Sequence, residues 1–535
     1  MFTTGRIHEE RLAAVVLLVL GVCATRPAHA EDSNAEFQDL SGFAVAHGDF
    51  NGDGYQDVAV GAREEDIGSV PSAGAVDVLY GGASGLGQAA RQFWNADTAN
   101  VEGVAEARAY FGTSLASIDF NADGYDDLAV GVPGATVNGE TAAGAVSVLY
   151  GSPSGLSATF VSDQLWNQDS PAVEETAEYG DSFGSTLAAG DFNADGFGDL
   201  AIGAPGEVLS AKFYAGGVNV IYGSMSGLSA TAVHDQRWNQ DVNNVEDVVE
   251  AYDYFGSALA TADFNADGYD DLAVGVRGES VNGVASAGAV NVIYGSGTGL
   301  SATTVPDQRW NQDSAEVEDA AEESDCFGLA LATGDFNDDG YADLAIGAPN
   351  EKLSGQLGAG AVNVIYGSGT GLSTTAVRDQ RWDQDKNNVE DVVENGDRFG
   401  SSLTSADFNA DGYDDLAIGV PSESVDSKDL AGSVNVLYGA ASGLSATTVP
   451  DQRWEQNIAD VEDAAERGDN FGRSLTAADF NADGYADLAI GVPYESVVCF
   501  SGEIDNAGAF NVLYGAVPGL SATTVPDQFW TQPCP

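Results

Sequence analysis

The chain has 535 residues and a formal net charge of −64, from 83 acidic and 19 basic side chains. A polyanion of this size repels nucleic acid and anionic membrane surfaces and attracts cations, so nucleic-acid binding is excluded. Hydrophobic residues make up 44 % of the chain, which is ordinary for a globular protein and excludes general disorder.

The first thirty residues have the order of a secretory signal peptide. Arg6 and Arg11 precede the apolar run LAAVVLLVLGVCA, and the AHA at 28–30 offers small residues for cleavage. The run is short for a membrane span, which needs about 20 apolar residues. We therefore expect cleavage to leave residues 31–535 secreted, or held outside the cytoplasm at a cell surface or in a periplasm. We expect no membrane insertion after cleavage; an uncleaved anchor or lipidation at Cys23 is the alternative.

One acidic stretch recurs throughout the chain. DFNADGYDDLAV runs from Asp119 to Val130, and variants begin at Asp49, Asp191, Asp263, Asp335, Asp407 and Asp479. The intervals are 70 residues and then 72 residues five times. Repetition at this period indicates a propeller, a solenoid or another repeat array. We predict that 31–535 is a single repeat domain, with units starting near 41, 111, 183, 255, 327, 399 and 471.

Each unit contains four segments with strand character. In the fourth unit these are FGSALATADF before the acidic stretch, DLAVGV after it, AGAVNVIYG, and SATTVPDQRW, where Pro306 suits an edge position. Four short strands repeated seven times predict an all-β fold: a seven-bladed β-propeller of four-stranded antiparallel blades with a 72-residue repeat. A straight β-solenoid is the structural alternative.

The acidic stretch has the donors of a calcium site. Counted from its first Asp, positions 1, 3, 5 and 9 are Asp or Asn in all seven copies, and position 6 is Gly. Alternate spacing lets these side chains and the carbonyl of position 7 converge on one centre, and Ca²⁺ takes six to eight oxygen ligands. Mg²⁺ demands a tighter octahedron, and zinc would need His or Cys, which no loop contains. The pattern is not an EF-hand, since position 12 is not Glu and the flanks are strands. An ordinary polar hairpin is the alternative, but it explains only the glycine.

We therefore predict up to seven structural Ca²⁺ ions. The predicted ligands are Asp49, Asn51, Asp53, Tyr55, Asp57; Asp119, Asn121, Asp123, Tyr125, Asp127; Asp191, Asn193, Asp195, Phe197, Asp199; Asp263, Asn265, Asp267, Tyr269, Asp271; Asp335, Asn337, Asp339, Tyr341, Asp343; Asp407, Asn409, Asp411, Tyr413, Asp415; and Asp479, Asn481, Asp483, Tyr485, Asp487.

The chain resembles the FG-GAP repeat proteins, the family of the integrin α-subunit N-terminal β-propeller. FG stands at 111, 183, 255, 327, 399 and 471, and GAP or a near form follows at 131, 203, 347, 419 and 491. The first unit departs, with Ser41-Gly42 and GAR, and the fourth has GVR. The resemblance implies calcium in the loop between the first two strands of a blade. Integrin legs, transmembrane segment and inserted domain are missing, so receptor signalling does not carry over.

No catalytic constellation stands out. After signal cleavage only His47 and His234 remain, and no nucleophile elbow or phosphate-binding loop is present. Seven equivalent sets of carboxylates favour a structural role over one glycosidase site. One Trp per unit predicts packing within or between blades, with a ring of sugar-stacking sites as the alternative. Arg467-Gly468-Asp469 spells the tripeptide that integrins recognise, but its Gly and Asp belong to the repeat, so we interpret the match as coincidence.

Cysteines give no disulfide framework, because only Cys326, Cys499 and Cys534 remain after cleavage. Cys499 and Cys534 both lie in the last unit and could pair, leaving Cys326 free.

The segments after each Trp and each GAP are long and variable, and variable loops on a rigid scaffold commonly carry binding. We therefore expect a secreted adhesion or ligand-binding module whose partner is an extracellular protein or glycan. An extracytoplasmic hydrolase and a purely structural cell-surface protein are the alternatives. The acidity is also compatible with adaptation to salt.

Overall fold

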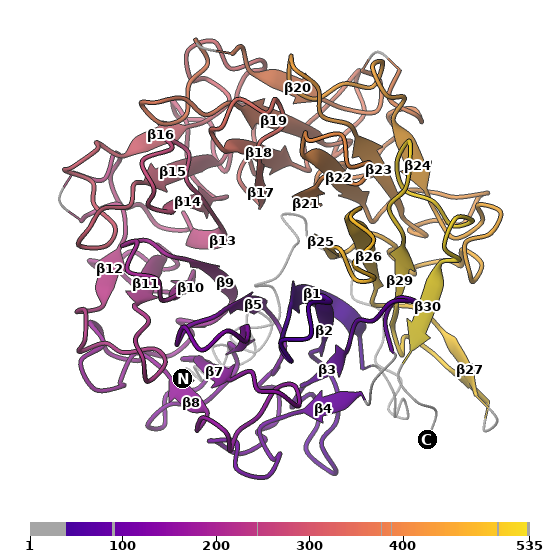
Figure 1. The fold of residues 1–535 in the computed structure, drawn as a ribbon. Helices are drawn as coiled ribbons and strands as arrows, with labels where there is room; N and C mark the ends of the chain where they lie inside the picture. Colours follow the sequence, from indigo (N-terminus) through magenta and orange to yellow (C-terminus); the bar gives the residue numbers. More distant parts are fainter. Residues whose placement is uncertain are drawn as a thin grey trace, which may run out of the picture.

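The computed structural model describes residues 39–87, 91–242, 244–375, 377–386, 388–499 and 502–531. Seven four-stranded sheets surround a central axis, each forming one blade of a propeller (Figure 1). Each blade is made of strands consecutive in sequence that pair antiparallel with their neighbours. The predicted all-β class and the seven four-stranded blades are confirmed. The predicted signal peptide lies outside the described residues.

Each blade takes its four strands in chain order. Blade 1 contains β1 (Ser41–Gly48), β2 (Asp57–Ala62), β3 (Ala75–Leu79) and β4 (Gln92–Trp94). Blade 2 contains β5 (Leu115–Ile118), β6 (Asp127–Val132), β7 (Ala145–Leu149) and β8 (Gln164–Trp166). Blade 3 contains β9 (Thr186–Gly190), β10 (Asp199–Ala204), β11 (Gly217–Ile221) and β12 (Gln236–Trp238). Blade 4 contains β13 (Phe255–Ala262), β14 (Asp271–Val276), β15 (Ala289–Ile293) and β16 (Gln308–Trp310). Blade 5 contains β17 (Ala330–Gly334), β18 (Asp343–Ala348), β19 (Ala361–Ile365) and β20 (Gln380–Trp382). Blade 6 contains β21 (Ser402–Ala406), β22 (Asp415–Val420), β23 (Ser433–Leu437) and β24 (Gln452–Trp454). Blade 7 contains β25 (Leu475–Ala478), β26 (Asp487–Val492), β29 (Ala509–Leu513) and β30 (Gln528–Thr531).

The fourth strand of each blade is shorter than predicted. In blade 4 it covers only Gln308–Trp310, and residues 302–306 form turns. Ser301 Oγ accepts hydrogen bonds from the N–H groups of Thr303 and Thr304 at 3.2 and 3.1 Å. Because Pro306 has no N–H to donate to a sheet, the extended prediction is wrong for this part of SATTVPDQRW.

Blade 7 also carries an insertion. A two-stranded hairpin, β27 (Val497–Cys499) and β28 (Gly502–Ile504), lies in the connection between β26 and β29 and projects from the ring (Figure 1). The side chains of Cys499 and Cys534 are outside the described residues. Cys326 is disulfide-bonded, so the expectation that it is free is wrong.

The hydrophobic core is shared between neighbouring blades. The middle strands, such as β14 and β15, are buried along their whole length. In one cluster, Val76 and Val78 of blade 1 pack with Leu128 and Val130 of blade 2. Each blade therefore buries its apolar faces only by contacting both neighbours, as repeat proteins do.

The FG and GAP glycines meet across every blade boundary. A Cβ on Gly131 of blade 2 would lie 2.1 Å from the carbonyl oxygen of Gly184 in blade 3. The same approach recurs at all seven boundaries, including Gly491 against the carbonyl of Gly42, at 2.1 to 2.4 Å. Only glycine leaves room for this backbone contact. The first unit lacks Phe and Pro at these motifs but keeps both glycines, Gly42 and Gly61.

A tyrosine at the end of each third strand links each blade to the next. Tyr222 donates its hydroxyl hydrogen to Gln236 Oε1 at 2.5 Å and accepts the N–H of Leu300 in the next blade at 3.1 Å. The adjacent Gly299 has φ +96°, and a Cβ there would lie 2.1 Å from the Tyr222 hydroxyl. The ring closes by the same contact, because Leu86 N donates to the Tyr514 hydroxyl and to Gln528 Oε1 at 3.4 and 3.0 Å. Closure therefore needs no strand exchange between the first and last blades.

We predict that Gly347→Ala destabilises the fold by at least about 1–3 kcal/mol, because its Cβ would lie 2.2 Å from the Gly400 carbonyl oxygen. Gly217→Ala is the matched control: its Cβ would meet atoms no closer than 3.7 Å, and other units have Ala at this position. We expect that control to change the free energy of unfolding by less than about 0.5 kcal/mol. Urea denaturation measures both, and equal effects for the two variants would contradict the boundary argument.

Candidate metal centres and acidic clusters

The seven acidic loops connect the first and second strands of each blade. In blade 4, Asp263 Oδ1 accepts the N–H of Asp267 at 3.1 Å, and Oδ2 accepts the N–H of Gly268 at 2.8 Å. The same pair of bonds is present in all seven loops. Gly268 has φ +90°, which explains the glycine at position 6. The loop backbone is thus folded around the carboxylate of position 1.

The ninth position has a structural role that the sequence analysis did not foresee. Asp271 is fully buried; its Oδ2 accepts the N–H of Phe264 at 2.9 Å, and its Oδ1 accepts the N–H of Gly295 at 2.8 Å. This carboxylate therefore ties the acidic loop to the end of β15. Burial, with the charges of Asp263 and Asp267 adding to it, raises the pKa of Asp271 to about 8. A nearby cation would favour the ionised form.

The third position supplies the clearest test of whether the loop fits a metal. In blades 1, 3, 4 and 7 the Asn Oδ1 accepts the N–H of position 5. In blades 2, 5 and 6, Asn121, Asn337 and Asn409 are buried, yet neither the oxygen nor the nitrogen of the side-chain amide has a hydrogen-bond partner within the described part of the chain. A buried polar atom without a partner destabilises the fold by about 1–3 kcal/mol. A bound metal ion that accepts these amide oxygens as ligands would remove this cost. Carboxylate, amide and carbonyl oxygens together fit Ca²⁺.

A second set of carboxylates lies on the opposite face, which the connections between second and third strands and between successive blades form. We call this the loop face. In five blades, three acidic side chains bring one oxygen each within 4.8 Å of one another and could hold a metal ion. These loop-face clusters are Glu178, Asp181, Glu207; Glu250, Asp253, Glu279; Glu322, Asp325, Glu351; Glu394, Asp397, Glu423; and Glu466, Asp469, Glu495. Among the described residues, the groups that meet this distance criterion are these rather than the acidic loops.

The loop-face clusters already have protein donors. In blade 3, Gln168 Nε2 donates to Glu207 Oε2 at 2.8 Å, and Arg237 Nη2 lies 3.4 Å from Glu207 Oε1. The Glu178 N–H donates to Asp181 Oδ2 at 2.6 Å. Burial and then the charge of Asp181 raise the pKa of Glu207 to about 8. Glu207 and its counterparts stand two residues after the third residue of each GAP-type motif, so their recurrence can be read in the sequence. The variable residues around them hid their shared role.

Several residues that the sequence analysis singled out are buried or packed within the fold. Asp469, the last residue of Arg467-Gly468-Asp469, is 2 % exposed and accepts the N–H of Glu466, so the tripeptide does not present its carboxylate. Trp94, Trp238, Trp382 and Trp454 are buried in the clusters between blades, which confirms their packing role.

His47 Nδ1 lies 2.9 Å from Thr476 Oγ1. It lines an axial cavity of about 330 Å³ that the first strands of all seven blades form. Burial lowers the pKa of His47 to about 4.

Comparison with known families agrees with the repeat. The FG-GAP repeat model matches residues 41–79, 111–149, 183–221, 255–293, 327–365, 399–437 and 471–510. The chain belongs to the FG-GAP repeat family. Each FG-GAP match spans the first two strands of one blade, its acidic loop and all or part of the third strand.

Two relatives share only part of their length with this FG-GAP chain. Phosphatidylinositol-glycan-specific phospholipase D of Bos taurus is 34 % identical over 168 residues, which is 31 % of this chain and 19 % of that protein. Integrin alpha-PS2 of Drosophila melanogaster is 30 % identical over 265 residues, or 47 % of this chain and 16 % of that protein. The matches thus span under a fifth of either relative. Among solved structures, rhamnogalacturonan lyase YesW gives a TM-score of 0.40 at 11 % identity, covering 84 % of this chain and 69 % of that one.

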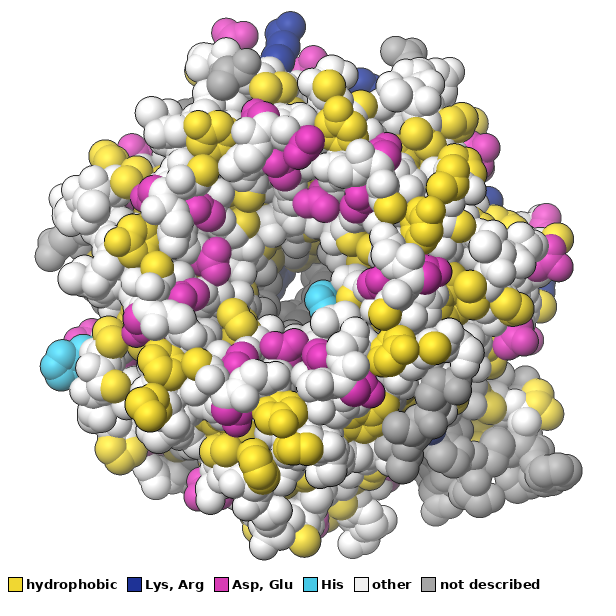
Figure 2. Space-filling model, in the orientation of Figure 1, with side chains coloured by type: hydrophobic (Ala, Val, Ile, Leu, Met, Phe, Trp, Pro, Cys, Tyr) yellow, Lys and Arg dark blue, Asp and Glu magenta, His cyan; other side chains and the backbone are white. Residues whose placement is uncertain are grey.

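Figure 2 shows acidic side chains around the central opening of the ring, with few Lys or Arg on the face in view. Among the described residues, no helix has the length and apolarity that a membrane crossing requires.

The raised pKa of Glu207 predicts a pH dependence of stability. A Glu of the unfolded chain titrates near 4.3, so the folded state binds the extra proton between that value and about 8, and stability falls as pH rises through this window. Glu207→Gln should weaken this fall by up to about 1.4 kcal/mol per pH unit. Urea denaturation at several pH values between 5.5 and 7.5, with calcium saturating, measures the slope. Glu140→Gln, at an exposed glutamate, is the control; an unchanged slope for Glu207→Gln would contradict the prediction.

Proposed function

We propose that this protein is a secreted, calcium-stabilised FG-GAP propeller that acts as an adhesion or ligand-binding module outside the cytoplasm. Residues 31–535 form the mature domain, and the ligand is an extracellular protein or a glycan bound at the loop face. The observation that carries the calcium part is the set of buried, unpartnered amide oxygens of Asn121, Asn337 and Asn409 inside acidic loops. Membership of the FG-GAP family supports the ligand-binding part.

Calcium would act by holding neighbouring blades together. The carbonyl oxygen of each loop's first Asp accepts a backbone hydrogen bond from position 8 of the next blade's loop, as from Asp270 N to Asp191 at 3.1 Å. The last loop bonds to the first, from Gln56 N to Asp479 at 3.4 Å. Each loop also concentrates three carboxylates, which repel one another until a cation neutralises them. Ordering one loop therefore supports the next.

We expect calorimetry to count close to seven Ca²⁺ ions per chain and EGTA to lower the melting temperature by tens of degrees. At twenty-fold above the dissociation constant each site would contribute about 1.8 kcal/mol. Asp123→Ala removes a predicted ligand and should lower the count by one. Ala122→Ser changes position 4, which varies among the seven loops, and should leave the count unchanged. A chain that binds no calcium and melts identically in EGTA would overturn the calcium part.

The loop face is the best place for a ligand because its connections differ most between units. The connection from β26 to β29 carries the extra β27–β28 hairpin, whereas other blades span the same gap without it. Exposed apolar side chains on these connections include Phe213, Tyr252 and Leu357, at 61, 54 and 65 %. Variable connections on a rigid ring are where recognition is commonly built.

The binding part is tested with the mature protein on arrays of glycans and extracellular proteins, each in calcium and in EGTA. We expect calcium-dependent binding that is lost when Phe213 and Tyr252 are replaced together by Ser. Substituting Met225, which is 86 % exposed in the connection between β11 and β12 on the opposite face, should have no effect. Binding that survives the double substitution would place the ligand elsewhere; no binding on any array would remove the adhesion proposal.

An extracytoplasmic hydrolase is the second candidate, because one relative is named as a phospholipase D. That match covers 19 % of the relative. Release of a glycan-anchored substrate by the purified chain, measured against a heat-denatured control, would favour the enzyme over the binding module. A purely structural role would be indicated by assembly into a surface layer without either activity.

A further inference from the structure

Blades 3 to 6 each contain a similar polar network beneath the loop face, in which an Arg pairs with an acidic side chain of the connection and a Gln donates to a buried Glu. In blade 3, Arg237 forms ion pairs with Glu175 and Glu207, and Gln168 donates to Glu207. Asn219 Nδ2 donates to the carbonyl oxygen of Glu174 at 3.0 Å, and Asp181 belongs to the loop-face cluster. These side chains lie between the two connections and the outer strand of the blade.

Blade 2 has lost the whole network. Counting back 72 residues, the equivalents of Gln168, Glu175, Asp181, Glu207, Asn219 and Arg237 are Ala96, Gly103, Ala109, Ala135, Ser147 and Leu165. All six replacements are smaller or uncharged, and none restores a partner for another. Independent drift would leave some charged residues stranded in a buried place, at a cost of several kcal/mol each. The joint change keeps blade 2 foldable and replaces charged and amide side chains by small or apolar ones.

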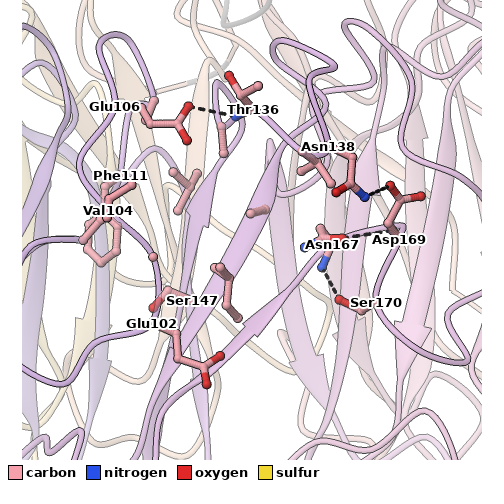
Figure 3. A pocket seen from close by; sticks show the side chains of 18 of the residues that line it. Glu102, Val104, Glu106, Phe111, Thr136, Asn138, Ser147, Asn167, Asp169 and Ser170 are labelled. Carbon is pink, nitrogen blue, oxygen red and sulfur yellow. Dashed lines mark hydrogen bonds between the residues drawn. The ribbon is translucent and has the colours of Figure 1, made fainter.

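A cavity of about 420 Å³ lies between the two connections of blade 2 (Figure 3). All six replaced positions line it, and it reaches the core residues Phe111, Val132 and Ala145. The cavity at the same place in blade 3 is lined by Glu175 and Arg237 and does not include Gln168, Asp181, Glu207 or Phe183. The blade 3 cavity has nearly the same volume, about 400 Å³, so loss of the network changes the lining of the cavity and not its size. In blade 2 the cavity has an apolar floor, and its volume is in the range of ligand pockets.

The pocket contains a buried polar group with no protein partner. Ser147 is 1 % exposed, and its Oγ makes no hydrogen bond with any described residue. It occupies the position from which Asn219 reaches the Glu174 carbonyl, so it faces the backbone of Glu102. A buried hydroxyl without a partner costs free energy that a ligand hydrogen bond would recover.

The rim of the pocket is acidic. Glu102, Glu106 and Asp169 line it, and no Lys or Arg does among the described residues. Glu106 Oε2 accepts the N–H of Thr136 at 3.1 Å, and Asp169 Oδ2 accepts from Asn138 Nδ2 at 2.6 Å, so these two carboxylates are held at the mouth (Figure 3). Glu102 is exposed on the other connection. Carboxylates around an apolar cavity on a chain of net charge −64 favour cations and repel anions.

We propose that the blade 2 pocket binds a protonated amine carried on a short apolar stem. The stem lies against Leu165, Val132 and Phe111, and the ammonium group is held by the rim carboxylates and donates to Ser147 Oγ. This inference rests on the proposed ligand-binding function and names one site for it. A free alkylamine and a lysine side chain of a protein ligand share this chemistry.

The test is calorimetric titration of the calcium-loaded mature protein with hexylammonium, 1-hexanol and hexanoate. We expect hexylammonium to bind with Kd about 1 mM, as a ligand of this size allows. 1-Hexanol should bind at least about tenfold more weakly, and hexanoate should not bind. Nα-acetyl-lysine N-methylamide is the second arm: binding as tight as hexylammonium indicates a protein side chain, and binding of hexylammonium alone indicates a free amine. Equal binding of hexylammonium and 1-hexanol would overturn the proposal.

A refilled variant provides the decisive control. Ala96→Gln, Gly103→Glu, Ala109→Asp, Ala135→Glu, Ser147→Asn and Leu165→Arg together copy the blade 3 network into blade 2. The variant gains three carboxylates and one guanidinium, a net change of −2, so non-specific attraction of amines rises while polar side chains cover the apolar floor of the pocket. We expect hexylammonium binding to disappear with an unchanged calcium count; undiminished binding would refute the site. If the refilled chain fails to fold, Ala135→Leu fills the cavity by one side chain and should weaken binding at least tenfold.

The outcome also separates this inference from the proposed function. Array binding at the loop face with no hexylammonium binding would refute the pocket alone. Loss of both, in a protein that still binds calcium and melts normally, would refute the ligand-binding function as well.

Discussion

The close approach of two glycine backbones at each blade boundary is the constraint on which the ring depends. The two backbone segments come so close that no Cβ fits between them. At this separation the blades can share their apolar faces, and each tyrosine after a third strand can reach the next blade, as Tyr222 reaches the N–H of Leu300. The contact is identical in kind at all seven boundaries, and the closing one between Gly491 and Gly42 has the same spacing as the others. The outer edge of each blade is a short fourth strand, such as the three residues of β16, and propellers limit exposed sheet edges in this way.

The acidic loops form a second ring of contacts between blades, on the face opposite the loop face. Their backbones are bonded in series, so the conformation of one loop limits that of the next. The carboxylate of position 9 extends this order into the blade, since Asp271 holds both the loop and the end of β15. Metal binding at such a site would act on the interfaces rather than on one hairpin. That arrangement explains why every blade retains the motif even though the loop-face connections diverge.

The sequence predicted what the repeat period and local chemistry determine, and missed what depends on contacts between distant residues. The first three strands, the blade number and the loop glycines follow from alternation and turn rules. The fourth strand was overextended, because the hydrogen bonds of Ser301 to Thr303 and Thr304 compete with the sheet. The role of Asp271 toward Gly295 spans 24 residues and leaves no local signal. The loop-face clusters combine residues from separate connections, and only the folded blade brings Glu178 beside Glu207.

Close repetition makes the exceptions informative. With seven copies of one blade, each unit is a reference for the others, and a position that departs can be judged by its neighbours in space rather than by itself. Ala109 alone, or Leu165 alone, would pass as ordinary variation. Six departures meet in one cavity and leave a buried hydroxyl at Ser147 with no partner among the described residues, so we interpret them together as a change in what the blade binds. The fold tolerates that change because the glycine contacts and the tyrosine bonds that hold blade 2 in the ring lie outside the emptied network. A propeller held together at its boundaries is thus free to alter the interior of a single blade.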